Sequence, residues 1–93
     1  MFGAQARWPR SAVTTSGEST TYLRVADSGN RIALHFCPRC GATVFFVGDS
    51  QPDVIAIPIG AFADATFPPP RFSVYEDRMH PWVATPEGVE HLA

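Results

Sequence analysis

The stretch His35-Phe36-Cys37-Pro38-Arg39-Cys40-Gly41 decides the fold, because it holds both cysteines of the 93-residue chain. Thiolates at this spacing are typical zinc ligands, since one tight turn can direct two sulfurs at one ion. The proline fixes φ inside the turn, and the final glycine tolerates the positive φ needed to bend back. Strand-like runs flank the turn at 31–36 and 43–47. The sequence therefore predicts a β-hairpin with Cys37 and Cys40 at its tip.

Cys37 and Cys40 amount to half of a closed structural zinc site, which needs four ligands. A redox dithiol is a second interpretation, but such a pair normally opens a helix after a strand, whereas strands flank this one on both sides. Two buried apolar cysteines are a third, which the spacing disfavours. His35 is a candidate further ligand if it shares a strand face with Cys37. A histidine that faces solvent or caps a hydrogen bond is the favoured interpretation.

Length and composition indicate one small domain over residues 1–93. Apolar residues make up 45% of the chain and charged residues 17%, which is too apolar for a disordered protein. The net charge of −2, without a cluster of basic residues, argues against binding nucleic acid through its phosphates. No apolar run of about 18 residues is present to span a membrane. The N-terminus does not resemble a signal peptide, so a cytoplasmic location is expected.

Short alternating segments, separated by turn residues, predict a mainly β fold with six or seven strands. Asp27-Ser28-Gly29-Asn30 is typical of a hairpin turn. Pro58 predicts that its strand lies at an edge or ends there. Residues 86–93 are expected to form a polar tail with one turn. Strands are expected at 2–8, 13–15, 21–26, 31–36, 43–47, 54–59 and 72–75, and single helical turns at 9–12 and 61–65.

Several other side chains have both a functional and a structural interpretation. Glu76-Asp77-Arg78 is interpreted as a charged turn rather than a pair of catalytic carboxylates. His80 and His91 show no ligand spacing and are expected to be structural or exposed. Large aromatic residues are interpreted as core rather than as the lining of a pocket. These residues are Trp8, Phe45, Phe46, Phe62, Phe72 and Trp82.

Two motifs together resemble the glutathione-dependent formaldehyde-activating (GFA) family. The segment 35–46, HFCPRCGATVFF, resembles that family's zinc-ribbon-like segment. FSVYEDR at 72–78 and HPWV at 80–83 look like its C-terminal signature. The early segments 2–6 and 9–13 are also similar to the family. The resemblance extends over nearly the whole chain.

The resemblance implies small antiparallel sheets pinned by zinc, of the Mss4-like or β-tent type. It implies a carbon–sulfur lyase that reversibly joins formaldehyde and glutathione to give S-hydroxymethylglutathione, with Zn²⁺ as cofactor and a small thiol as substrate. Family members hold one structural zinc with four cysteines, two of which match Cys37 and Cys40. The other two come from an N-terminal C-x-C, and a C-x-C-x-x-C cluster holds a catalytic zinc.

Neither N-terminal cluster occurs in this sequence. The resemblance therefore assigns Cys37 and Cys40 as structural ligands only, and it assigns no catalytic residue. The chain resembles the C-terminal two-thirds of such an enzyme, so an N-terminally truncated domain is expected. A second hypothesis is a non-catalytic zinc-binding module, in which two chains of a homodimer complete a four-cysteine site. A redox dithiol is the third.

Overall fold

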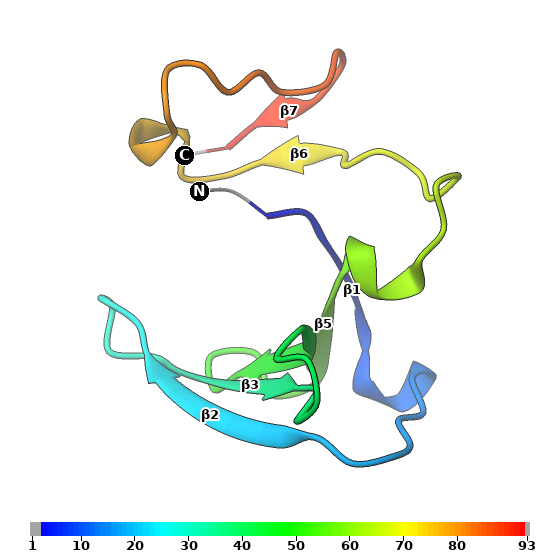
Figure 1. The fold of residues 1–93 in the computed structure, drawn as a ribbon. Helices are drawn as coiled ribbons and strands as arrows, with labels where there is room; N and C mark the ends of the chain where they lie inside the picture. Colours follow the sequence, from blue (N-terminus) through cyan, green and yellow to red (C-terminus); the bar gives the residue numbers. More distant parts are fainter. Residues whose placement is uncertain (1–2, 93) are drawn as a thin grey trace.

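Antiparallel pairing of five strands builds the main sheet of the protein, for which a computed structural model describes residues 3–92 (Figure 1). Alternating apolar residues favour strands in these segments, because each strand can then turn one face away from water. The mainly β prediction is confirmed. In order across the sheet the strands are β1 (Gln5–Pro9), β5 (Val54–Pro58), β4 (Thr43–Gly48), β3 (Arg31–Phe36) and β2 (Thr20–Val25).

A tight turn joins β2 to β3, as the sequence predicts. The backbone N–H of Ala26 donates to the carbonyl of Asn30 at 2.8 Å, and Gly29 takes a φ of 90°. Glycine suits this position because the left-handed region penalises a Cβ. The turn fixes the register of the ladder, in which Val25 lies opposite Arg31.

Strand β5 lies inside the sheet, between β1 and β4. Pro58 is its last residue, opposite Gln5 of β1, so the expected strand end is confirmed and the expected edge position is wrong. Ala56 pairs with Arg7 on one side and with Phe46 on the other. The N–H of the next residue, Ile59, donates to the carbonyl of Ala4 at 3.0 Å, so Pro58 and Gln5 form a non-hydrogen-bonded pair of this ladder. Proline is tolerated there because that pair needs no N–H from Pro58.

Other local predictions were displaced or wrong. The 3-10 turn η1 (Arg10–Ala12) confirms a helical turn after β1, and η2 (Ile59–Phe62) begins two residues before the turn expected at 61–65. No strand forms over residues 13–15, because that segment pairs with no neighbour. The N-terminal strand begins at Gln5, and the part of the prediction that concerned Phe2 lies outside the described residues.

Beyond η2 the chain crosses to a separate, smaller sheet, drawn in yellow and red in Figure 1. It pairs β6 (Phe72–Ser73) with β7 (Glu90–His91) in parallel, whereas small antiparallel sheets were expected. Tyr75 has a φ of 58°, so β6 ends earlier than the predicted 72–75. The 3-10 turn η3 (Glu76–Arg78) follows. Among residues 3–92, no helix is long and apolar enough to cross a membrane.

The core is small. Within residues 3–92, only the apolar residues Ile55, Ala56 and Val89 are buried. The core prediction is wrong for Trp82, which is 75% exposed, and for Phe62 and Phe72, which are also exposed. The other three aromatic residues of that prediction, Trp8, Phe45 and Phe46, are half-buried. An alternating pattern therefore produced strands here without producing a covered face.

Candidate metal centre

The turn between β3 and β4 carries both cysteines at a hairpin tip, as predicted. The N–H of Cys37 donates to the carbonyl of Ala42 at 2.9 Å, and the N–H of Gly41 donates to the carbonyl of Cys37 at 2.8 Å. Gly41 has a φ of 79°, which reverses the chain directly after Cys40. Two backbone hydrogen bonds and one glycine thus hold the turn that presents the sulfurs.

Hydrogen bonds converge on the sulfur of Cys37. The backbone N–H groups of Cys40 and of Arg39, together with the Cys40 thiol, hold the pKa of Cys37 below its ordinary value. Each donor favours the charged form of the sulfur that accepts it. The thiolate is the form of cysteine that binds metals. Cys37 and Cys40 occupy the two ends of one four-residue turn.

Neither cysteine forms a disulfide, and both remain accessible. Cys37 is half-buried and Cys40 is exposed. The turn leads from one strand into the next and opens no helix, so the arrangement that typifies a redox dithiol is absent at this turn. Two cysteines on one tight turn are of the type and spacing that supply two of the four ligands of a tetrahedral zinc site.

His35 contacts Phe45 and Thr21 rather than the two cysteines. Its ring stacks on Phe45 with centroids 4.3 Å apart, and its Nδ1 is 3.2 Å from the hydroxyl oxygen of Thr21. A register shift between His35 and Phe36 interrupts the strand alternation that would bring His35 onto the face of Cys37. Within residues 3–92, no three His, Cys, Asp or Glu side chains group closely enough to hold a metal ion. The preferred interpretation, a hydrogen-bonded strand histidine, fits this geometry.

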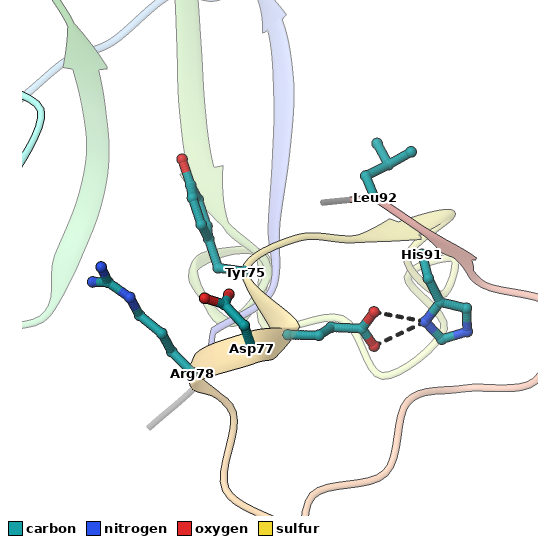
Figure 2. Close-up of a pocket in the computed structure, with 6 residues that line it drawn as sticks. Tyr75, Asp77, Arg78, His91 and Leu92 are labelled. Carbon is teal, nitrogen blue, oxygen red and sulfur yellow. Dashed lines mark hydrogen bonds and ion pairs between the residues drawn. The ribbon is translucent and has the colours of Figure 1, made fainter.

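A second cluster lines a shallow hollow in the C-terminal part (Figure 2). The His91 Nδ1 lies 2.8 Å from each carboxylate oxygen of Glu76. A carboxylate accepts hydrogen bonds, so the Nδ1 of His91 is the donor in this contact. The residues that line the hollow are Tyr75, Glu76, Asp77, Arg78, His91 and Leu92.

Sequence reasoning missed the contact between Glu76 and His91. The two residues are 15 positions apart, and the parallel pairing of β6 with β7 brings them together. Both strands have two residues, which is too short for an alternating pattern to identify. The prediction that Glu76-Asp77-Arg78 forms a charged turn agrees with η3, from which Arg78 contacts Asp27 at 3.2 Å.

Comparison with known proteins gave one finding. The family model described as glutathione-dependent formaldehyde-activating enzyme matches residues 1–81. The matched part includes the whole cysteine turn and η3, and it ends before β7. Searches of curated proteins and of solved structures gave no match.

Proposed function

This chain belongs to the glutathione-dependent formaldehyde-activating enzyme family, and on that premise we propose that Cys37 and Cys40 bind zinc as structural ligands. The observation that carries the proposal is the hairpin tip that brings the two thiols together and stabilises the thiolate of Cys37. Zinc binding requires deprotonated cysteines, so each N–H that favours the thiolate also favours the metal.

The domain, which we take to span residues 1–93, is of the carbon–sulfur lyase type by its family. In the reaction, the thiol of glutathione adds to the carbonyl carbon of formaldehyde. A carbon–sulfur bond forms, and the proton of the thiol passes to the carbonyl oxygen, giving S-hydroxymethylglutathione. Cys37 and Cys40 have no role in that step in this proposal. Their role is to hold the β3–β4 hairpin in place by binding the ion.

A reducing compartment suits this chemistry. The two cysteines are free thiols at the two ends of one four-residue turn, and oxidising surroundings would pair them or modify them. We therefore place the protein in the cytoplasm, where thiolates remain available for zinc and glutathione is abundant.

Metal analysis tests the zinc proposal. Protein purified in the presence of zinc is expected to retain the ion, and Cys37→Ser and Cys40→Ser are each expected to lose it. Serine is nearly isosteric with cysteine but does not supply a thiolate. Thr43→Ser, a conservative change next to the turn, is the matched control and should retain zinc. Equal zinc content in the cysteine variants and the control would overturn the assignment.

Activity is a separate measurement. Glutathione-dependent consumption of formaldehyde, followed by NMR of the hydroxymethyl product, tests the reaction type. Catalysis above the uncatalysed rate supports the lyase proposal. An inactive protein that nevertheless holds zinc would contradict the lyase proposal and support a non-catalytic module.

The alternative is a non-catalytic zinc-binding module. The exposed position of Cys40 favours one form of it, a zinc site shared by two chains. Hairpin tips of two chains can meet there, so that each chain donates Cys37 and Cys40 to a shared four-thiolate site. Native mass spectrometry distinguishes the two arrangements. One zinc per two chains, in a dimer that separates when a chelator is added, supports the shared site. One zinc per single chain contradicts it.

A further inference from the structure

The folded chain exposes more surface than a compact protein of its size. Its accessible area is 7525 Å² for a mass of 10.1 kDa. A compact monomer of that mass exposes about 5,300 Å². The excess is larger than the area of about 800 Å² that one partner contributes to an interface of standard size. The fold therefore leaves ample surface for association.

Strand β2 is an unprotected edge on that surface. It lies at one end of the sheet order, and all six of its residues are exposed. Tyr22, Leu23 and Val25 are 62%, 53% and 63% exposed. Edge strands are usually protected by proline, bulges or lysine. Strand β2 contains neither proline nor lysine, and its ladder with β3 is regular over all six residues.

The turn next to β2 shows which backbone groups face outward. The N–H of Ala26 donates to the carbonyl of Asn30, so these two residues form a hydrogen-bonded pair of the ladder. Hydrogen-bonded and non-hydrogen-bonded pairs alternate along an antiparallel ladder. It follows that Thr21, Leu23 and Val25 direct their N–H and C=O groups away from β3, toward the free edge.

We propose that the free edge of β2 binds β2 of a second copy of this chain, antiparallel, about a two-fold axis at Leu23. In this register Leu23 lies opposite Leu23 of the partner subunit, and Thr21 lies opposite Val25 of the partner subunit. All three outward-facing residues of each strand are then hydrogen-bonded. The five strands of each copy continue into one sheet of ten.

Side-chain chemistry favours this register over its neighbours. Tyr22 lies opposite Arg24 of the partner subunit, twice by symmetry, and an arginine over a tyrosine ring is a favourable pair. A shift by two positions in one direction places the two copies of Arg24 opposite each other, where like charges repel. A shift by two positions in the other direction places Val25 past the end of the partner subunit's β2, so that no β2 residue lies opposite it. The strand is self-complementary in the register centred on Leu23.

The proposed contact is independent of the zinc proposal. Thr20 pairs with Phe36, so the cysteine turn lies at the N-terminal end of β2. Antiparallel pairing places that end beside the C-terminal end of the partner's β2. The two cysteine turns therefore lie at opposite ends of the extended sheet and share no zinc. A chelator should leave this dimer intact.

Disulfide cross-linking tests the register directly. Opposed Cα atoms in a hydrogen-bonded pair are about 5.5 Å apart, within the range of about 4.4–6.8 Å that a disulfide spans. Leu23→Cys is therefore expected to link two chains under mild oxidation, with the linked peptides identified by mass spectrometry. Tyr22→Cys is the matched control, because its two copies are diagonal neighbours about 7–8 Å apart. The absence of a link at position 23, or a stronger link at position 22, overturns the proposal.

Light scattering on the unmodified chain gives the second test. The protein is expected at twice its chain mass of 10.1 kDa, with and without chelator. Leu23→Lys should be a monomer with an unchanged circular dichroism spectrum, because this exposed position accepts a lysine but two opposed lysines repel. A monomeric wild type, or a dimer that survives Leu23→Lys, overturns the edge contact. A dimer that dissociates when the chelator is added also overturns the edge contact, and it supports the zinc proposal.

Discussion

The five-stranded sheet and the C-terminal segment 59–92 are held together in different ways. The sheet has strands of five or six residues, and three of its four ladders pair five or six residues. The C-terminal segment has two strands of two residues and short 3-10 turns, and its one buried apolar residue is Val89. The cysteine turn belongs to the first region and the Glu76–His91 pair to the second. Strands of six residues position the cysteine turn, whereas a parallel pair of two-residue strands brings Glu76 and His91 together.

This difference predicts different responses to mutation. Removing a buried side chain from the sheet leaves a cavity beneath paired strands. Changes in the C-terminal segment affect side chains that water already reaches. Stability is therefore expected to be concentrated in the sheet.

Ile55→Ala is expected to lower the free energy of unfolding by about 2–5 kcal/mol. Ile55 is 4% exposed in β5, the strand that joins β1 to the rest of the sheet. Urea denaturation measures the change. Leu92→Ala is the control from the C-terminal segment, where Leu92 is 39% exposed. If both variants lost the same stability, the proposed contrast between the regions would be wrong.

Gly41→Ala is expected to lower the free energy of unfolding by about 1–2 kcal/mol, because the φ of 79° at this position is unfavourable for any residue with a Cβ. No atom lies within 4 Å of the added Cβ, so the cost arises from the backbone alone. Gly60→Ala is the matched control, since its site is equally open and its φ is not in the left-handed region. Thermal melts of the two variants should differ. Matching melts would argue against strain at the cysteine turn.

The thiol of Cys37 is expected to react with iodoacetamide at lower pH than an ordinary thiol, in protein treated with chelator. Its pKa is lowered first by the backbone N–H of Cys40, then by that of Arg39 and by the Cys40 thiol. A lowered pKa means that the reactive thiolate forms earlier as the pH rises. Cys40→Ala removes only the thiol donor, so it should move the pH profile of Cys37 alkylation part of the way back toward that of an ordinary thiol. A Cys37 profile identical in both proteins would exclude the contact between the two sulfurs.

Trp82→Ala is expected to change the free energy of unfolding by about 0.5 kcal/mol or less. Trp82 is 75% exposed, and its ring stacks on His80 with centroids 5.3 Å apart. Replacing a core tryptophan by alanine would lower the free energy of unfolding by about 3–5 kcal/mol. Urea denaturation again provides the measurement. A loss of that size would mean that another surface covers Trp82 in solution.

Sequence patterns predicted the main sheet well because its strands are long enough to show them. The turn at Asp27–Asn30, the hairpin at the cysteines and the strand end at Pro58 all follow from local chemistry. The interior position of β5 does not, because it depends on pairing with β1, which is distant from β5 in the sequence. The parallel β6–β7 pair was missed for the same reason.

The place of Cys37 and Cys40 at one hairpin turn could be predicted from their spacing alone, since both lie on one turn of four residues. The hydrogen bonds to the sulfur of Cys37 could not, because they depend on how that turn closes. The Glu76–His91 contact joins two segments that carry no recognisable pattern. Contacts of that kind are set by tertiary pairing.

By itself, the sequence determined the strands of the main sheet and the hairpin that presents Cys37 and Cys40. Alternation and turn residues act over a few positions, and so they are visible in the chain. Only the tertiary structure decided which faces are covered, which strand lies at the edge and which side chains meet across 15 residues. An alternating pattern of apolar and polar residues indicates which side of a strand is apolar. Burial depends on whether another part of the molecule lies against that side.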